Sequence, residues 1–265
     1  MSILIDENTT FIVQGITGRE AVNLTRECLD YGAGAKIVGG VTPGRKGRDV
    51  HGVPVFDTVA QAVEHHGAPI DGSVVTVPPA FTKDAVFEAI ENGVKIVVIV
   101  TERIPRADVA QMVELAKARD ARIIGPNCLG IIVPDVIKMG GIGGPAKDAA
   151  KAYTPGPVGV ISRSGGMTTE MSSTLSAAGL GQSTAVSIGG DAIIGSSYAV
   201  EDGQLVDAGD TVVSVFTLTA RGKGSGVETR RRNATVNTVE NGRITRVEYY
   251  TTEEEALAAA GLPTA

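Results

Sequence analysis

The stretch FIVQGITGREA at residues 11–21 decides the fold of this chain. Its first four residues form a short apolar, β-rich run, which predicts a strand. The following residues, from Gly15 through Gly18 to Ala21, have the G-x-x-G-x-x-A spacing of a turn that opens a helix. Glycines at such a turn let the backbone approach a phosphate, and the free N–H groups of the helix point at it. The stretch therefore predicts a nucleotide-type site after the first strand of an α/β sheet.

Alternation of strand and helix continues along the chain. Short apolar runs predict strands, and the segments between them have the apolar spacing of helices, such as the one expected at about residues 166–179. This order predicts parallel strands with right-handed crossovers, hence an α/β, Rossmann-like doubly wound sheet followed by a partial second α/β unit. The strands expected after the first are residues 35–38, 73–77, 95–100, 121–124, 156–161 and 183–187.

After about residue 200 the pattern changes to consecutive strands. Asn241-Gly242 is a strong hairpin signal because both residues tolerate positive φ. Thr252 and Glu255 have the spacing of a capping box before a last helix. We therefore expect an antiparallel meander plus one helix, an α+β tail. The three expected segments are a Rossmann-like domain at 1–150, a partial phosphate-loop unit at 151–199 and the tail at 200–265, whose strands are residues 212–220, 227–239 and 243–250.

The end of the second expected strand bears on the choice of nucleotide. A site for NAD typically has an acid there that holds the ribose hydroxyls. Residues 38–47 contain no carboxylate but do contain Arg45 and Lys46. Two cations suit a phosphate on the ribose, as in NADP or the 3′-phosphate of coenzyme A (CoA). The sequence therefore disfavours NAD.

Composition excludes several classes of protein. The chain has 265 residues and a formal net charge of −6, which argues against nucleic acid as a partner. Its two cysteines, Cys28 and Cys128, have no metal-site spacing, so we expect neither a metal centre nor a disulfide framework. No apolar run reaches the ~18 residues that cross a bilayer, and the first residues lack a signal-peptide pattern. We expect a cytoplasmic protein that does not associate with membranes.

A second turn of the same kind lies between the strand at 156–161 and the helix after it. Small hydroxyl residues and glycines from Ser162 to Glu170 predict an anion-binding helix N-terminus. A serine nucleophile is disfavoured because neither Ser162 nor Ser164 stands in a G-x-S-x-G elbow. We therefore expect no catalytic serine there.

These motifs together resemble the alpha subunit of the nucleoside-diphosphate-forming succinate–CoA ligases, also called succinyl-CoA synthetases. The likeness covers about residues 1–198. The stretches that carry it are Gly15–Gly18, Val38–Gly44, Val53–Phe56, Val77–Pro79, Val100–Glu102, Ile124–Cys128, Ser162–Gly165 and Ser187–Asp191.

The resemblance implies CoA or acyl-CoA as ligand, the role of an acid–thiol ligase subunit of the tricarboxylic acid cycle, and a ligase beta subunit as partner. It also implies that the loop at Ser162, Ser164 and Gly165 holds a phosphate. The CoA-binding residues that it suggests are Gly15, Thr17, Gly18, Arg19, Glu20, Arg45, Lys46, Val100, Thr101, Glu102 and Asn127.

One departure from the family bears on activity. The family carries its phosphoryl group on a histidine in the later part of the second domain. Here the three histidines, His51, His65 and His66, all precede the second turn, so none matches the phosphoacceptor. We therefore expect CoA binding without phosphoryl transfer and assign no catalytic residue.

The tail has a different resemblance, to the second half of the SnoaL-like polyketide cyclases and ketosteroid-isomerase-like proteins. It rests on residues 207–210, 221–228, 246–250 and 253–262. The chain would then be a fusion of two unrelated parts. Two alternatives remain at this point: a ligand-binding or homodimerising module that acts through the tail sheet, and an NADP-dependent reductase suggested by Arg45 and Lys46.

Overall fold

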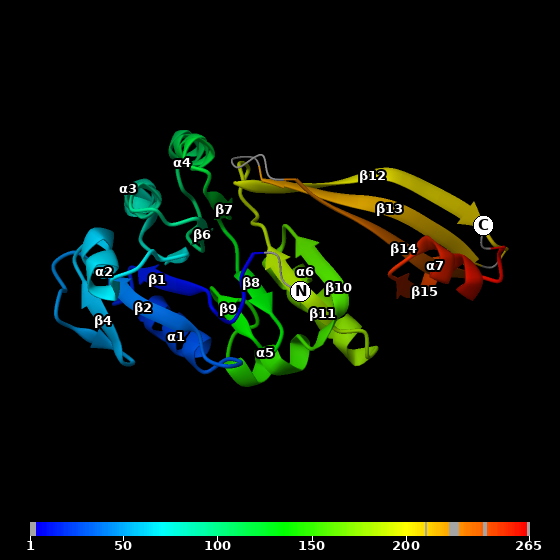
Figure 1. Ribbon diagram of the computed structural model, residues 1–265, viewed down its shortest axis with the longest axis horizontal. Coiled ribbons are helices and arrows are strands. Elements are labelled where there is room, and N and C mark those ends of the chain that lie inside the picture. Colours follow the sequence, from blue (N-terminus) through cyan, green and yellow to red (C-terminus); the bar gives the residue numbers. More distant parts are fainter. Residues whose placement is uncertain (1–3, 210, 223–227, 241–242, 264–265) are drawn as a thin grey trace. The chain divides into compact units, whose positions relative to one another are not determined.

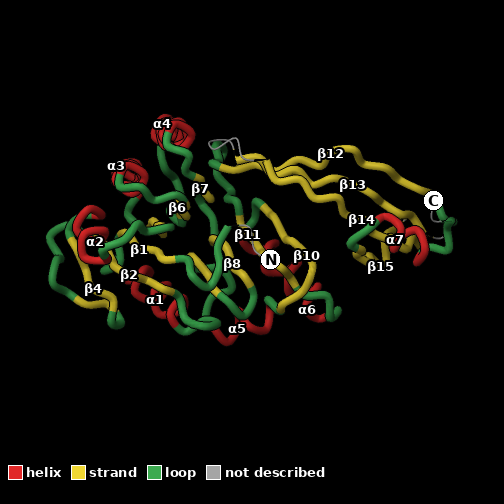
Figure 2. The backbone as a smooth tube through the Cα atoms, in the orientation of Figure 1, coloured by secondary structure: helices red, strands yellow, loops and turns green. Residues whose placement is uncertain are grey.

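The computed structural model describes residues 4–209, 211–222, 228–240 and 243–263 (Figures 1 and 2). The described chain divides into two compact units near residue 196. The first unit contains the sheets and helices up to residue 196, and the second contains the remaining strands and the last helix.

The first unit is built around a seven-stranded sheet with strand order β3-β4-β2-β1-β5-β6-β7. All neighbouring pairs are parallel except the β3–β4 hairpin. The parallel strands confirm the expected Rossmann-like fold. The strands are β1 (Thr10–Gln14), β2 (Lys36–Val41), β3 (Asp49–Val50), β4 (Val53–Phe56), β5 (Gly72–Val75), β6 (Ile96–Ile99) and β7 (Arg122–Ile124).

Alternate residues of this sheet face two different helix layers. Phe11 and Val13 of β1 pack in the same core as Leu24 and Cys28 of α1. Ile12, which points the other way, packs with α2. The same alternation directs Val75, Val97 and Ile99 toward α3 and α4. Helices therefore cover both faces of the sheet: α1 (Arg19–Leu29) on one, and α2 (Val59–His66), α3 (Pro79–Glu91) and α4 (Arg106–Ala118) on the other.

A second, four-stranded sheet of the first unit has the order β10-β11-β8-β9. Strands β10 (Pro155–Ser162) and β11 (Gln182–Ser187) are parallel, as expected, and are joined through α6 (Gly165–Ala177). Strands β8 (Gly130–Val133) and β9 (Ile137–Met139) form a hairpin that pairs antiparallel with β11. α5 (Ala146–Ala152) packs against α6 with Tyr153 and Ala149 in the shared core.

The second unit is a four-stranded sheet with the order β12-β13-β14-β15 and one helix. The last three strands are antiparallel, which confirms the expected meander. Thr252 caps the helix by accepting a hydrogen bond from the Glu255 N–H. The expected turn at 241–242 and residues 223–227, the last of which is the first residue of an expected strand, lie outside the described residues. The elements are β12 (Ser196–Asp207), β13 (Thr211–Gly222), β14 (Glu228–Glu240), β15 (Arg243–Tyr250) and α7 (Glu253–Ala259).

Five strands were missing from the sequence-based expectation: β3, β4, β8, β9 and β12. β3 and β9 are two and three residues long, and β4 contains Pro54, which argues against a strand in a search for alternating patterns. β8 and β9 also place residues 130–139 in the second sheet. The boundaries at residues 150 and 199 remain a prediction about independent domains. In the described part of the chain, no helix is long and apolar enough to cross a membrane.

Candidate functional site

The turn between β1 and α1 requires glycine at its first position. Gly15 has a φ of +85°, and a Cβ there would lie 2.9 Å from Thr76 Oγ1 and 3.2 Å from Val77 N. Its N–H donates to the Val41 carbonyl oxygen (2.7 Å), which ties the turn to the end of β2. The close approach of three strand ends therefore leaves no room for a side chain.

The N-terminus of α1 is open. Gly18 is the N-cap, and among the described residues no side chain is found to accept a hydrogen bond from the first N–H groups of the helix. The first i to i−4 bond is made by Val22, which donates to the Gly18 carbonyl oxygen (2.9 Å). The N–H groups of Arg19, Glu20 and Ala21 thus have no helical acceptor, and they lie at the positive end of the helix dipole. This arrangement suits an anion, above all a phosphate.

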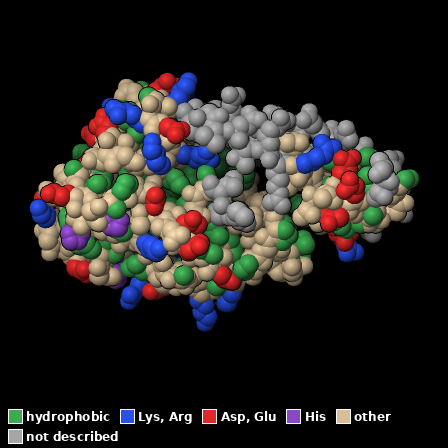
Figure 3. Space-filling view, in the orientation of Figure 1, with side chains coloured by type: hydrophobic (Ala, Val, Ile, Leu, Met, Phe, Trp, Pro, Cys, Tyr) green, Lys and Arg blue, Asp and Glu red, His purple; other side chains and the backbone are tan. Residues whose placement is uncertain are grey.

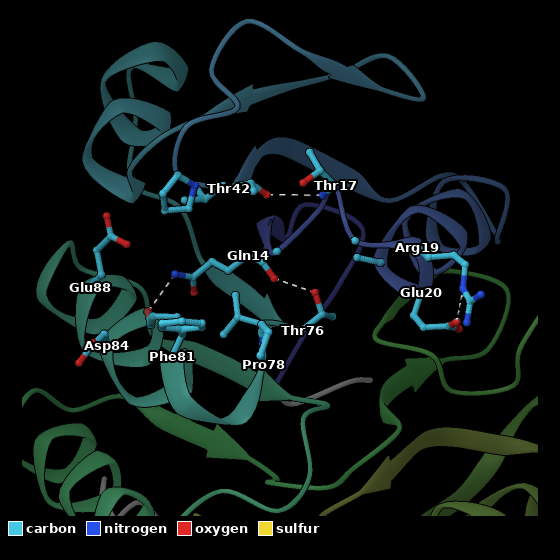
Figure 4. A pocket seen from close by; sticks show the side chains of 17 residues that line it. Gln14, Thr17, Arg19, Glu20, Thr42, Thr76, Pro78, Phe81, Asp84 and Glu88 are labelled. Carbon is cyan, nitrogen blue, oxygen red and sulfur yellow. Dashed lines mark hydrogen bonds and ion pairs between the residues drawn. The ribbon is translucent and has the colours of Figure 1, made fainter.

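A cavity of about 990 Å³ lies beside this N-terminus (Figure 4). It is formed where β2 and β5 flank β1 on opposite sides, so it occupies the point at which the strand order reverses. Open α/β sheets bind ligands at this point. The residues lining the cavity are Gln14, Gly15, Thr17, Gly18, Arg19, Glu20, Ala21, Val41, Thr42, Pro43, Thr76, Val77, Pro78, Phe81, Asp84, Ala85 and Glu88.

Gln14 holds one wall of the cavity in place. Its side chain is 2% exposed. Its amide nitrogen Nε2 donates to the Ala85 carbonyl oxygen of α3 (2.9 Å), and its Oε1 accepts from the Ser73 hydroxyl (2.8 Å). Its own carbonyl oxygen accepts from Thr76 Oγ1 (2.7 Å). Because every polar atom is paired in a buried setting, this network fixes α3 relative to the glycine turn.

The sequence-predicted residues of the first turn all lie at the cavity: Gly15, Thr17, Gly18, Arg19 and Glu20. Arg19 and Glu20 form an exposed ion pair in which Nε and Oε1 are 3.2 Å apart. The Thr17 N–H donates to Thr42 Oγ1 (3.5 Å), so the turn and the end of β2 share a contact.

The two predicted cations, Arg45 and Lys46, lie in the loop that continues from the cavity-lining residues Thr42 and Pro43, but they do not line the cavity themselves. Their backbone N–H groups both donate to Asp57 Oδ1, at 3.1 and 3.2 Å, and their side chains are exposed. These two hydrogen bonds hold the loop backbone in place. The charged side chains are exposed to solvent, and they follow the cavity-lining residues Thr42 and Pro43 by only a few positions in the chain.

The remaining CoA-binding predictions, Val100, Thr101, Glu102 and Asn127, follow β6 and β7 and lie outside the lining of this cavity. Thr101 Oγ1 donates to the carbonyl oxygen of Val77, a lining residue (2.7 Å), and the Asn127 N–H donates to the Thr101 carbonyl oxygen (3.0 Å). Hydrogen bonds therefore connect Thr101 and, through it, Asn127 to the cavity wall.

The second turn has a different arrangement. Ser164 caps α6 by accepting from the Met167 N–H (3.4 Å), and the Ser164 N–H donates to Ser162 Oγ (3.2 Å). A Cβ on Gly165 would lie 2.5 Å from Leu129 Cγ, which explains the glycine. Arg163 donates from Nε to the Gly189 carbonyl oxygen (3.3 Å) and from Nη2 to the Asp191 carbonyl oxygen. The two serines therefore accept from backbone donors of their own turn, and Arg163 connects the turn to the segment after β11.

The buried thiols are poor nucleophiles. Burial raises the pKa of Cys28 from 9.0 to about 11 and that of Cys128 to about 12. Burial likewise lowers the pKa of Lys138, whose Nζ lies 3.7 Å from Glu27 Oε2 and donates to the Ile142 carbonyl oxygen. Among the described residues, no group of three or more His, Cys, Asp or Glu side chains is placed to hold a metal ion.

Sequence reasoning missed the wall of the cavity that α3 contributes. Pro78, Phe81, Asp84, Ala85 and Glu88 all line it. A signal was available, because Pro78 and Pro79 follow the strand at 73–77 and a proline in the first turn commonly opens a helix. The pairing of β5 with β1, which brings this helix to the glycine turn, is a tertiary contact that the local pattern does not specify.

Comparison with known proteins finds similarity over the part of the chain that contains the cavity. Residues 6–103 match the family described as CoA binding domain. The chain is 44% identical over 200 residues to succinate–CoA ligase [ADP-forming] subunit alpha 1 of Archaeoglobus fulgidus, covering 75% of this chain and 65% of the relative. The corresponding alpha subunit of Staphylococcus aureus (strain N315) is 43% identical over 198 residues, with 75% of this chain and 62% of that protein covered.

A solved structure has a similar fold over most of this chain. ATP citrate lyase from Methanothrix soehngenii, determined in complex with citrate and coenzyme A, superposes with a TM-score of 0.64 at 25% identity. The match covers 71% of this chain and 32% of that one. The chain thus spans less than two thirds of the length of the two curated relatives named above, at 65% and 62%. It contains a CoA-binding domain and, over three quarters of its length, is similar to the alpha subunits of succinate–CoA ligases.

Proposed function

We propose that the cavity beside the N-terminus of α1 is the CoA site and that the phosphates of CoA lie on the free N–H groups of Arg19, Glu20 and Ala21. The observation that carries this proposal is the uncapped helix N-terminus at the point where the strand order reverses. The volume of about 990 Å³ suits a ligand of this size. Arg45 and Lys46, exposed in the adjoining loop, supply cations for the 3′-phosphate.

The remaining predicted contacts extend this site. In this proposal Val100, Thr101, Glu102 and Asn127 meet the part of CoA beyond its phosphates. Thr101 is hydrogen-bonded to Val77 of the wall, and Asn127 is hydrogen-bonded to Thr101. The turn at Ser162, Ser164 and Gly165 is the phosphate loop of the same ligase-like chain. Similarity to ligase alpha subunits makes a beta subunit the expected partner. An NADP-dependent reductase has no support from the fold or the relatives.

Calorimetric titration of the full chain with CoA tests the site. We expect saturable binding with one site per chain, and no binding to Gly18→Glu, because a carboxylate at the N-cap would occupy the phosphate position. Arg45→Ala should weaken CoA binding several-fold through loss of one phosphate contact. Arg119→Ala, an exposed cation at the end of α4, is the matched control and should leave affinity unchanged. Unchanged binding to Gly18→Glu would contradict the proposed position.

We also propose that this chain binds CoA without carrying a phosphoryl group. Its histidines lie away from the second turn in the fold: His51 Nε2 is 3.2 Å from the Val22 carbonyl oxygen, and the His65 ring packs 5.0 Å from that of Phe56. Incubation with a nucleoside triphosphate labelled at the terminal phosphate should leave the protein free of acid-labile label. Stoichiometric labelling would contradict this part of the proposal.

For the second unit we propose the half-cone architecture that the tail sequence resembles. A meander whose one face packs against α7, through Val213, Val215, Ala234, Val236 and Ala256, supports this proposal. In such a half fold the sheet is available for pairing with a second copy of the chain. Light scattering of the full chain should then give the mass of a dimer, whereas the mass of a monomer would contradict pairing.

A further inference from the structure

Lys138 places an ammonium group in the interior of the first unit. Its side chain is 0% exposed, and it lies in the middle of β9, where both neighbouring residues are also buried. Moving a charged group from water into the interior is costly unless oxygen atoms of the protein replace the lost water. The chain therefore has to supply a set of acceptors around this nitrogen.

Three oxygen atoms of the chain lie around the Lys138 Nζ. It donates to the carbonyl oxygens of Ile142 (3.3 Å) and Gly144, and it lies 3.7 Å from Glu27 Oε2. An ammonium has three N–H donors and no acceptor, so two carbonyls and a carboxylate match it. Carbonyl and carboxylate oxygens are also ligands of inorganic cations. The same oxygen atoms therefore suit a small cation with a single charge.

The two carbonyls belong to a glycine loop whose shape is imposed by packing. Residues 140–144 read Gly-Gly-Ile-Gly-Gly. Gly143 has a φ of +76°, and a Cβ there would lie 2.7 Å from Ala149 Cβ of α5. Ile142 is buried in the core that α5 and α6 share. The positions of the carbonyl oxygens are therefore set by the packing of the loop as well as by the ammonium.

The site joins α1 to the second sheet. Glu27 belongs to α1, whereas Lys138 and the glycine loop belong to β9 and the segment after it, and α1 lies beside β9 (Figure 1). A second contact follows directly, because the Cys28 thiol donates to the Gly140 carbonyl oxygen (3.4 Å). Both contacts hold the C-terminal half of the helix whose N-terminus adjoins the cavity. Since packed elements transmit displacements, this hold also sets the position of the first N–H groups of α1.

Resting on the proposed CoA site, we propose that Glu27 and residues 140–144 form a monovalent-cation site, that the Lys138 ammonium fills it as a tethered cation, and that the filled site positions α1 for CoA. Lys138 is thus a positioning residue that does not touch CoA. When this side chain is shortened, the site should take a small free cation. Ammonium is the nearest equivalent, because it has the same N–H donors.

Lys138→Ala removes the tethered cation and leaves space for a free one. In tetramethylammonium chloride, whose cation is too large and lacks N–H donors, the melting temperature of the full chain should fall by about 10 °C. Ammonium chloride at the same concentration should restore about half of this loss, increasingly so as its concentration rises. The unmodified chain, whose site is filled, should show no such ammonium effect. Lys151→Ala, the same change in an exposed ion pair with Asp148, is the matched control and should show none either.

CoA affinity is the second readout, measured by calorimetry well below the melting temperature. Lys138→Ala should bind CoA about tenfold more weakly in tetramethylammonium chloride and recover to within about threefold in ammonium chloride. Lys138→Met fills the space with an uncharged side chain, so it should bind CoA weakly in both salts. Glu27→Gln removes the carboxylate of the site at a side chain that is 26% exposed, and it should weaken CoA binding about threefold in both salts.

The outcomes separate the parts of the proposal. Equal melting temperatures of Lys138→Ala in the two salts, or a variant that is unfolded in both, would overturn the cation site. Unchanged CoA affinity in Glu27→Gln would overturn the positioning of α1, and this variant carries that test if Lys138→Ala does not fold. Failure of the unmodified chain to bind CoA contradicts the proposed function, and the melting experiment still tests the cation site by itself.

Discussion

The turn from β1 to α1 and the turn from β10 to α6 both connect a parallel strand to a helix, yet they differ in how the helix N-terminus is satisfied. At α1 the N-cap is Gly18, which has no side chain to accept a hydrogen bond, and a cavity of about 990 Å³ adjoins the free N–H groups. At α6 the N-cap is Ser164, whose hydroxyl accepts from the Met167 N–H. At α1 no N-cap side chain accepts from these donors, whereas at α6 the N-cap serine accepts from one of them.

The difference shows that small residues at a helix start do not by themselves decide whether a side chain of the same turn accepts from the first N–H groups of the helix. Both sequences have small residues at a helix start, and both predict phosphate binding from the pattern alone. What separates them in the structure is the N-cap residue, which is glycine at α1 and serine at α6. The following four predictions test this comparison.

Gly15→Ala should have the largest effect on stability. The substitution places a side chain at a φ of +85° and a Cβ 2.9 Å from Thr76 Oγ1, so we expect a loss of about 2–4 kcal/mol in the free energy of unfolding and at least tenfold weaker CoA binding. Gly44→Ala is the matched control, with a φ of +74° and no atom within 4 Å of its Cβ. It should cost only about 1 kcal/mol. Urea unfolding measures both, and equal losses would contradict a role for close approach at the first turn.

The next largest effect should be a loss of stability at alkaline pH, because α1 carries a buried thiol at Cys28. Burial raises the pKa of this thiol from 9.0 to about 11, so the folded chain keeps a proton that the unfolded chain has lost. The stabilisation is present below pH 9 and is lost as the pH rises to 11, by about 2–3 kcal/mol. Unfolding free energies at pH 8 and pH 11 should show a shallower decrease in Cys28→Ala. If the free energy of unfolding decreases equally in Cys28→Ala and in the unmodified chain, ionisation of Cys28 is not a cause of the loss.

Ser164→Ala should have a smaller effect. It removes the cap of α6, and we expect a loss of about 1 kcal/mol in the free energy of unfolding, the usual contribution of an N-cap hydroxyl. CoA affinity should be unchanged, because this serine does not line the cavity at α1. A loss of CoA affinity larger than about threefold would mean that the two turns act on one ligand region.

Gly18→Ser should have the smallest effect on stability and the most specific effect on binding. It gives α1 the cap that α6 already has, at a φ of −70° that any residue adopts. Stability should change by at most a few tenths of a kcal/mol, because the new cap is offset by a Cβ that would lie 3.2 Å from the Gly15 carbonyl oxygen. CoA affinity, measured by calorimetry, should fall several-fold because the new hydroxyl competes for the same N–H groups. Undiminished affinity would show that the uncapped N-terminus is not where phosphate binds.

Much of the fold was predictable because its signals are local. The apolar runs at 73–77 and 95–100 are bounded by turn residues, and they became β5 and β6 almost at the expected positions. Strands β8 and β9 were missed, because four and three residues form a strand here only by pairing with β11 and with each other. Segments of three or four residues are too short to show the alternation of apolar and polar residues that identifies a strand.

The candidate site likewise contains residues that could be predicted from sequence and residues that could not. The glycine turn was identified from sequence, since the requirement for a positive φ at Gly15 is a property of its own backbone. The α3 wall was not, because Phe81 and Asp84 come more than sixty residues later and meet the turn only through the parallel pairing of β5 with β1. Arg45 and Lys46 were expected at the site, and the structure places them in the adjoining loop outside its lining.

The sequence by itself determined the doubly wound fold, the glycine turn, the antiparallel tail and the preference for a CoA-type ligand over NAD, because periodicity, turn chemistry and charge are carried by neighbouring residues. Only the tertiary structure decided that the cavity adjoins the N-terminus of α1, which wall faces it and where Asp84 lies. These depend on strand pairing and on competition for hydrogen-bond donors between distant segments, and no local pattern records the outcome of that competition.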